Sequence, residues 1–91
     1  MRNFVVLVQG ENFNLDVEGA IQPAGFFATR RAEAETEEEA SSQVISQLLT
    51  EPEISGKGLP GHTILVKVAH EMPIEHKNTY SGFTFYPLEK A

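Results

Sequence analysis

The chain has 91 residues, 41% of them hydrophobic, which indicates one small globular domain that buries only about two-thirds of its unfolded surface. Its 13 acidic and 7 basic residues give a net charge of −6, which argues against a non-specific nucleic-acid binder, because such proteins need a basic surface. The absence of cysteine excludes disulfides, thiolate catalysis and cysteine-ligated metal sites.

Two strands are predicted at the start of the chain. Phe4–Val8 is apolar throughout and rich in β-branched residues, as in a central strand. It is too short for a signal sequence or a membrane span, so we expect a cytoplasmic protein without membrane contact. Residues 10–12 end this strand, and residues 13–18 alternate between apolar and polar as a second, half-buried strand.

A third strand is predicted after turns at Gly19 and at residues 23–25. It covers residues 25–35, where side chains alternate between two faces. One face carries Phe26, Ala28, Arg30, Ala32 and Ala34. This face is apolar except for Arg30, and we place it beneath the helix that follows.

The stretch 36–50 predicts the single helix. Its apolar residues recur at three- and four-residue spacing and form one stripe: Ala40, Val44, Ile45, Leu48 and Leu49. Thr36 can cap the first turn, and Glu39 can reach back to the Thr36 amide. Pro52 ends the helix, because the residue before a proline is disfavoured in helical geometry.

The second half of the chain begins with a predicted mobile loop at residues 51–61, which contains two prolines and three glycines. A strand follows at residues 62–70. One face of it would hold His62, Ile64, Val66, Val68 and His70, and the other Thr63, Leu65, Lys67 and Ala69. Residues 72–81 are turn-like, and residues 82–87 predict a short strand at the sheet edge.

This order of strand, strand, strand, helix, strand, strand favours one α+β domain over residues 1–91. We expect a two-layer sandwich, in which one helix packs on one face of an antiparallel sheet of four or five strands. The second face would carry an interface of Val5, Leu7, Phe27, Leu65 and Tyr86. That is more apolar surface than a small monomer usually exposes. Either the segment 13–23 folds over it, or two copies pair face to face as a homodimer.

Two motifs resemble cofactor sites. Residues 56–61 spell G-x-G-x-x-G, but they follow a helix and precede a strand, the reverse of a dinucleotide site, so we interpret them as a flexible loop. His70 and His76 lie six apart with Pro73 between them, which excludes the zinc-protease helix. A metal site of these two histidines with Glu71 or Glu75 is the alternative to surface histidines, and we predict no metal or other cofactor.

Arg30 is the most informative polar residue, because a guanidinium on a core-facing position must be paired. One interpretation is an ion pair with Glu11 or Asp16 near the sheet edge. The other is an anion site built from Arg30 and Arg31, to which His62 could add.

Residues 10–13, Gly-Glu-Asn-Phe, and residues 25–34, Gly-Phe-Phe-Ala-Thr-Arg-Arg-Ala-Glu-Ala, precede an acidic helix start. Together they resemble a family of small uncharacterised bacterial proteins over roughly the first half of the chain. The resemblance implies a bacterial source and no particular activity. It also groups Glu11 and Asn12 with Arg30, so the candidate ligand or anion site comprises Arg30, Arg31, Glu11 and Asn12.

No catalytic constellation is readable in the chain. The sequence therefore favours a non-enzymatic protein-interaction module, such as a small acidic inhibitor or immunity-type factor, that forms a homodimer and also binds another protein. The alternative is a small-molecule or anion-binding protein that uses Arg30, Arg31 and the 53–61 loop. An enzyme is the third possibility.

Overall fold

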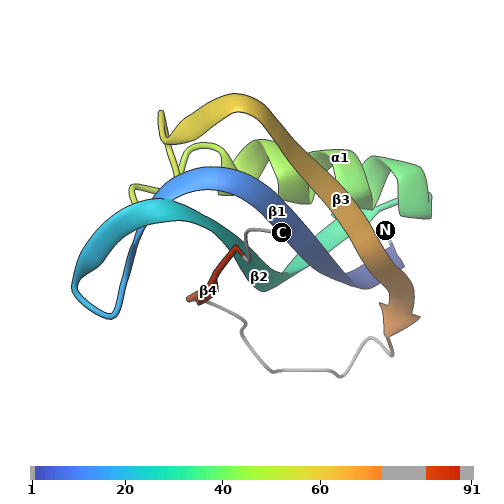
Figure 1. Ribbon diagram of the computed structural model, residues 1–91. Helices are drawn as coiled ribbons and strands as arrows, with labels where there is room; N and C mark the ends of the chain where they lie inside the picture. Colours follow the sequence, from blue (N-terminus) through green and yellow to red (C-terminus); the bar gives the residue numbers. More distant parts are fainter. Residues whose placement is uncertain (1, 73–81, 89–91) are drawn as a thin grey trace.

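The computed structural model describes residues 2–72 and 82–88. Its elements are, in chain order, β1 (Arg2–Val17), β2 (Ala20–Ala34), α1 (Glu37–Leu48), β3 (Gly58–Met72) and β4 (Thr84–Pro87). The strands form a four-stranded antiparallel sheet in the order β3-β1-β2-β4, with α1 against one face (Figure 1). An antiparallel sheet with one helix agrees with the predicted α+β arrangement.

The predicted element order is wrong, because the first two predicted strands are one. β1 continues through residues 10–12, and its pairing with β2 shifts by one residue between Gly10 and Phe13. Asn12 accommodates this β-bulge in the left-handed region, at φ 65°, which asparagine adopts more readily than most residues. The long β1 and β2 strands curve along their length instead of forming a flat layer (Figure 1).

Gly10 lies directly beneath the ring of its cross-strand partner, Phe26. A Cβ at this position would overlap the ring, so a larger residue requires Phe26 to move. Phe26 meets Phe13 edge to face, with ring centroids 5.2 Å apart, and Phe83 at 5.5 Å. Aromatic packing on the helix side therefore stabilises the bulged part of β1.

A two-residue turn, Glu18 and Gly19, joins β1 to β2 as predicted. Both residues have positive φ, 53° and 89°, as type I′ hairpin turns require. The second predicted turn, at residues 23–25, is wrong, because these residues belong to β2. Pro23 is opposite Asn14, whose N–H donates to the Lys57 carbonyl at 2.8 Å and so points away from β2. The residue at position 23 therefore donates no backbone hydrogen bond to β1, and a proline, which has no N–H, costs none there.

The start of α1 matches the prediction closely. The Thr36 hydroxyl accepts a hydrogen bond from the Glu39 backbone N–H at 3.1 Å, which caps the helix. The Glu39 carboxylate accepts from the N–H of Glu35, at 3.4 Å, instead of the predicted Thr36 N–H. The buried stripe is narrower than the apolar pattern: Ala40, Val44 and Leu48 are fully buried.

The connection between α1 and β3 is shorter than the predicted loop, because β3 already begins at Gly58. Successive backbone hydrogen bonds close turns over residues 51–57, and Ile54 is fully buried beneath them. The G-x-G-x-x-G stretch leads into a strand, as expected, and not into a helix. The mobility of residues 51–61 stays a prediction.

The core lies between α1 and the sheet face that it covers. Its members are Phe4, Val6, Val8, Phe13, Leu15, Val17, Ala24, Phe26, Ala28, Ala34, Ala40, Val44, Leu48 and Ile54. Because Phe13, Leu15 and Val17 belong to this core, the segment 13–23 does not fold over the opposite face. At the far edge, β4 pairs with residues 24–27 of β2, which confirms a short edge strand, although it begins at Thr84 instead of residue 82. The turn predicted at residues 72–81 falls, from residue 73 on, outside the described residues.

Candidate interaction surface

The sheet face turned away from α1, here called the open face, carries the five residues of the predicted interface. Val5 and Leu7 alternate along β1 with buried core residues and so point to this face. Phe27 and Leu65 are both cross-strand partners of Gln9, which lies on the same face. Tyr86 pairs with Gly25, two residues from Phe27 in β2, and its ring contacts that of Phe27.

A second β-bulge, in β3, changes which side chains reach the open face. Val66 pairs with Val8 and Val68 pairs with Leu7, so Lys67 is an extra residue. Val66 consequently packs against the core, whereas Val68 points with Leu7 to the open face and is 47% exposed. The predicted alternation, which put Val66 and Val68 on one face, is wrong beyond the bulge. Ala69 packs against the core for the same reason.

Val68 is therefore an interface candidate that the sequence did not reveal. A β-bulge leaves no reliable local pattern, because Leu65–Ala69 alternates as readily in a regular strand. The one feature of the sequence that could indicate the bulge is Lys67 between two valines. A charged residue is tolerated in an edge strand, where it can remain without a cross-strand partner.

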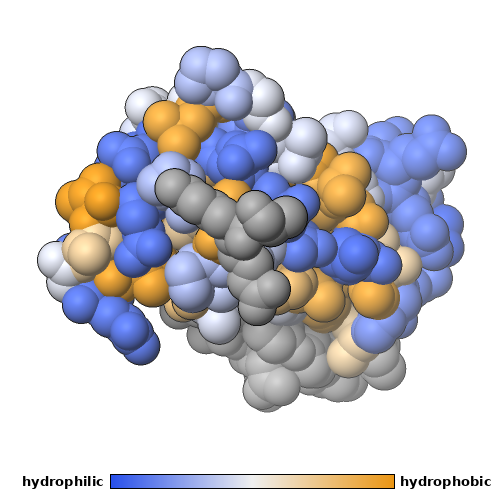
Figure 2. All heavy atoms as spheres, in the orientation of Figure 1, coloured by the Kyte–Doolittle hydropathy of each residue, from blue (hydrophilic) through white to orange (hydrophobic). Residues whose placement is uncertain are grey.

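Six side chains form what we call the open-face cluster: Val5, Leu7, Phe27, Leu65, Val68 and Tyr86. The exposed fractions are 53% for Leu65, 47% for Val68 and 36% for Phe27. Figure 2 shows hydrophobic side chains in several places on the viewed side of the molecule, with hydrophilic ones between them. The cluster spans all four strands of the sheet.

Tyr86 is held in place at the β4 end of this cluster. Its ring lies over Gly25, where a Cβ would overlap it. Gln9 donates from Nε2 to the Tyr86 hydroxyl at 2.6 Å, and the Tyr86 ring centroid is 5.3 Å from that of Phe27. A ring fixed in this way loses little conformational freedom when a partner binds, which makes it suitable as an anchor.

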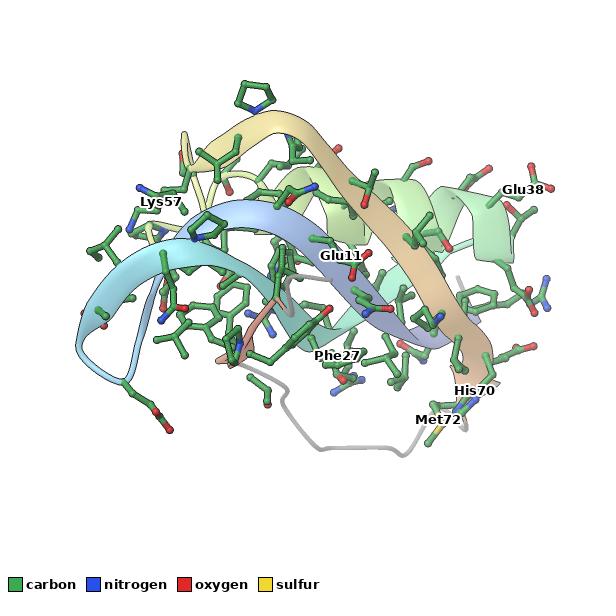
Figure 3. All side chains as sticks on the ribbon, viewed as in Figure 1. Glu11, Phe27, Glu38, Lys57, His70 and Met72 are labelled. Carbon is green, nitrogen blue, oxygen red and sulfur yellow. The ribbon has the colours of Figure 1, made fainter. Side chains whose placement is uncertain are left out.

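Charged side chains stand at both ends of the cluster. Val5 lies between Arg31 of β2 and His70 of β3. Glu11 lies further along β1 on the same face, at about 20 Å from Val5 for a rise of 3.3 Å per residue. Figure 3 labels His70 near the end of β3 and Glu11 well apart from it. Arg31 and His70 thus flank Val5 at one end of the cluster, and Glu11 lies toward the other end.

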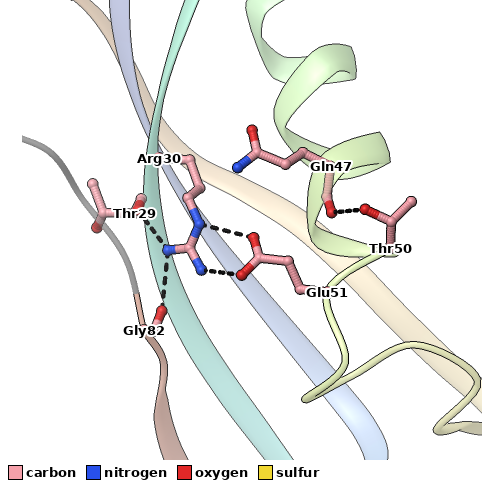
Figure 4. Close-up of polar contacts among 6 residues, drawn as sticks. All are labelled: Thr29, Arg30, Gln47, Thr50, Glu51 and Gly82. Carbon is pink, nitrogen blue, oxygen red and sulfur yellow. Dashed lines mark hydrogen bonds and ion pairs between the residues drawn. The ribbon is translucent and has the colours of Figure 1, made fainter.

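Arg30 does not reach the open face. It is 3% exposed on the core side, and its carboxylate partner is Glu51, just after α1 (Figure 4). Arg30 Nε donates to Glu51 Oε2 at 3.0 Å, and Nη2 donates to Oε1 at 2.8 Å. Nη1 donates to the carbonyl oxygens of Thr29 at 2.8 Å and Gly82 at 3.0 Å. This is the bidentate geometry that makes arginine–carboxylate pairs strong.

The predicted need for a carboxylate partner is confirmed, but both predicted partners of Arg30 are wrong. Glu11 points to the opposite face of the sheet. Asp16 accepts a hydrogen bond from the Gly19 N–H at 2.9 Å in the β1–β2 turn. The Arg30 guanidinium also lies over the Phe83 ring, 5.0 Å from its centroid. The guanidinium is therefore surrounded by groups of the protein itself.

The four residues of the predicted anion site lie apart. Arg30 faces the core, and Arg31, the next residue in β2, faces the open side. Asn12 lies in the β1 bulge, where its Nδ2 is 3.4 Å from the Gly61 carbonyl oxygen. Of the four, only Arg31 and Glu11 share a face, and they stand at its two ends.

The described histidines also stay separate. The His62 ring contacts Phe13 edge-on, with centroids 5.1 Å apart, whereas His70 lies on the open face beside Val5. His76 lies outside the described residues, as does the predicted metal site that would contain it. Within the part of the chain that the structure describes, no group of three or more His, Asp and Glu side chains could hold a metal ion.

Arg2 and Glu71 form an ion pair at the other end of the sheet, with Nη2 2.9 Å from Oε1. The hydrogen bond from Arg2, together with its charge, lowers the pKa of Glu71. The same contact raises the pKa of Arg2. Both side chains are about half exposed, so this pair adds little to stability.

Comparison with protein-family models, with curated proteins and with solved structures gives no match to this chain. The resemblance to a bacterial family therefore stays a prediction. Within residues 2–72 and 82–88, no helix is long and apolar enough to span a membrane.

Proposed function

We propose that this protein is a non-enzymatic protein-interaction module and that the open-face cluster is its binding surface. The observation that carries the proposal is the exposure of Leu65, Val68 and Phe27 on one face. Moving an apolar side chain of this size from full exposure to full burial is favourable by roughly 1.5–3 kcal/mol, and a partner that covers all three would gain part of this value for each. Several large apolar side chains exposed on the same face of a sheet are typical of interaction sites.

The bulge at Lys67 supports the same proposal. In a regular strand, Val68 would share the core face of Val66, but the extra residue turns it outward beside Leu7. β-bulges are frequent where a side chain must be redirected next to a functional site. The small size and net charge of −6 fit an acidic inhibitor or immunity-type factor, which would act by binding a protein.

Site-specific photocrosslinking in the native cell tests this function. A benzoylphenylalanine in place of Leu65 should crosslink to a protein, identified by mass. The same group in place of Gln43, which is exposed on α1, should not. Adding Val68→Asp should abolish the Leu65 crosslink, whereas adding Ser42→Asp on α1 should leave it. Equal crosslinking from positions 65 and 43, or none from either, would refute the binding surface.

A further inference from the structure

We propose that the open face binds an arginine side chain of a basic partner protein, an inference that rests on the proposed function. The guanidinium lies against the rings of Phe27 and Tyr86 and pairs with the carboxylate of Glu11. These three side chains come from β2, β4 and β1, which are neighbouring strands of the sheet. They are together called the arginine site.

The register of the sheet brings the three side chains together. Gln9 is the cross-strand partner of Phe27, and its Nε2 donates to the Tyr86 hydroxyl at 2.6 Å. Glu11 follows Gln9 by two residues on the same face of β1, at about 7 Å along the strand. Gly25, beneath the Tyr86 ring, lies opposite the bulged part of β1 that contains Glu11. One arginine side chain can therefore reach both rings and the carboxylate.

The two rings provide an aromatic surface for the guanidinium. Their centroids are 5.3 Å apart and their planes are inclined by 31°. Phe27 is 36% exposed, and Tyr86 is fixed by its hydrogen bond from Gln9. A planar guanidinium stacks on aromatic faces, whose electrons attract a cation. On the core side of the same sheet, Arg30 already lies over the Phe83 ring in this way.

Glu11 supplies the counter-charge for the arginine. Its side chain is half-buried, and within the described residues its carboxylate has no hydrogen bond or ion pair. A carboxylate can accept two parallel hydrogen bonds from one guanidinium, as Glu51 does from Arg30. A lysine ammonium is a point charge without this planar fork, so the site favours arginine over lysine.

The charge of the chain favours a basic partner over an acidic protein or a second copy. The net charge of −6 attracts a positively charged protein at long range and repels another copy of the chain. The open face carries the carboxylates of Glu11 and Glu33. Its Arg31 already has an interaction within the chain, and its His70 is counted as neutral in the net charge. On balance, this face presents negative charge to a partner.

Peptide titration of the purified protein tests the arginine site. The probe is a capped peptide with one arginine between two leucines, and matched peptides carry lysine or citrulline, the uncharged isostere of arginine. The NMR signals of Gln9, Glu11 and Phe27 report binding. We expect the arginine peptide to bind about tenfold more tightly than the citrulline peptide, and also more tightly than the lysine peptide.

Substitutions in the protein show which groups cause this preference. Glu11→Gln should weaken binding of the arginine peptide about fivefold and change binding of the citrulline peptide by less than about twofold. Phe27→Leu keeps an apolar side chain but removes a ring, so it should also weaken binding of the arginine peptide. Thermal unfolding shows whether each variant is folded.

Glu53→Gln is the matched control, because it removes the same charge from an exposed position in the turn after α1. It should have little effect at about 0.15 M salt, where distant charges are screened. The arginine site would be overturned if the citrulline or lysine peptide bound as tightly as the arginine peptide. An equal loss from Glu53→Gln and Glu11→Gln would also overturn it, because net charge alone would then explain binding.

The crosslink from position 65 separates this inference from the proposed function. The captured protein should carry a net positive charge, and Glu11→Gln should reduce its crosslinking. A crosslink that Glu11→Gln leaves unchanged, or one to a second copy of this chain, would overturn the arginine site and keep the proposed function. The absence of any crosslink from position 65 would refute the proposed function, even if the arginine peptide binds.

Discussion

Arg30 of β2 and Glu51 of the turn after α1 form a bidentate ion pair whose two side chains are unequally buried, 3% and 23% exposed. The same guanidinium donates to the carbonyl oxygen of Gly82, just before β4. One buried side chain therefore connects β2, the end of the helix and the approach to β4. The unequal burial has a measurable consequence.

We expect Glu51→Ala to destabilise the protein by about 3–5 kcal/mol, because it leaves the buried Arg30 guanidinium without a counter-charge. Arg30→Met should cost less, because the partly exposed Glu51 carboxylate can be rehydrated while the methionine fills much of the apolar space. Urea unfolding of both variants gives the two free energies.

The double variant Arg30→Met with Glu51→Leu provides the internal control. It removes both charges, so it should be more stable than Glu51→Ala alone. Glu53→Ala, at an exposed position two residues away, should change the free energy of unfolding by no more than about 0.5 kcal/mol. A double variant as unstable as Glu51→Ala would show that the cost arises from lost packing instead of an unpaired charge.

Arg30 illustrates which features of a buried charge can be predicted from the sequence. Strand alternation placed it on the core face, and the cost of burying a guanidinium required a carboxylate partner; both conclusions are confirmed. The partner itself was not predictable, because Glu51 is 21 residues away and reaches Arg30 only through the position of the helix end. Local patterns give the face and the need for a partner, whereas three-dimensional packing selects it.

The N-cap of α1 provides a second prediction. Thr36→Ala should destabilise the protein by about 1 kcal/mol, because the Glu39 N–H loses the hydroxyl that accepts its hydrogen bond. Thr36→Ser should be close to neutral, because serine keeps that hydroxyl. Ser42→Ala, at an exposed position inside the same helix, should not destabilise, because alanine is the better helix former. Thermal or urea unfolding compares the three variants, and an equal loss for alanine and serine at position 36 would contradict the cap.

The Arg2–Glu71 pair gives a prediction about pH. Because Arg2 lowers the pKa of Glu71 in the folded state, folding favours the ionised carboxylate. The stabilisation is fully present above the ordinary pKa of 4.5 and is lost as the pH falls through the folded-state pKa. The stability difference between the natural chain and Glu71→Gln should therefore shrink on acidification below 4.5, and also with added salt.

Stability measured against pH in an Arg2→Met background separates this pair from other carboxylates. In that background, Glu71→Gln should have an effect that no longer changes with pH in the acidic range. If the pH dependence of the Glu71→Gln effect is the same with and without Arg2, the ion pair does not cause it.

The two β-bulges mark where sequence reasoning failed. At residues 10–12, composition indicated a strand end, but Asn12 adopts positive φ and β1 continues. In β3, strict alternation predicts that Val68 faces the core. This prediction is wrong because the unpaired residue Lys67 changes the face of every residue after it. Both errors have one cause: the local residue pattern does not show whether an interruption ends the ladder or only shifts it.

Deletion of Lys67 tests the β3 assignment directly. Val66 already pairs with Val8 and Val68 with Leu7, so removing the residue between them should leave a regular ladder with every other side chain on its present face. We expect the deletion variant to fold with a free energy of unfolding within about 1 kcal/mol of the natural chain. Deletion of Val6 is the contrast, because it would put part of the central strand β1 out of register with both of its neighbours and turn core side chains outward. Urea unfolding should therefore show a cooperative transition for the Lys67 deletion and none for the Val6 deletion. If the Lys67 deletion also unfolds, the bulge does more than direct Val68 to the open face. It is then required for the curvature of the sheet.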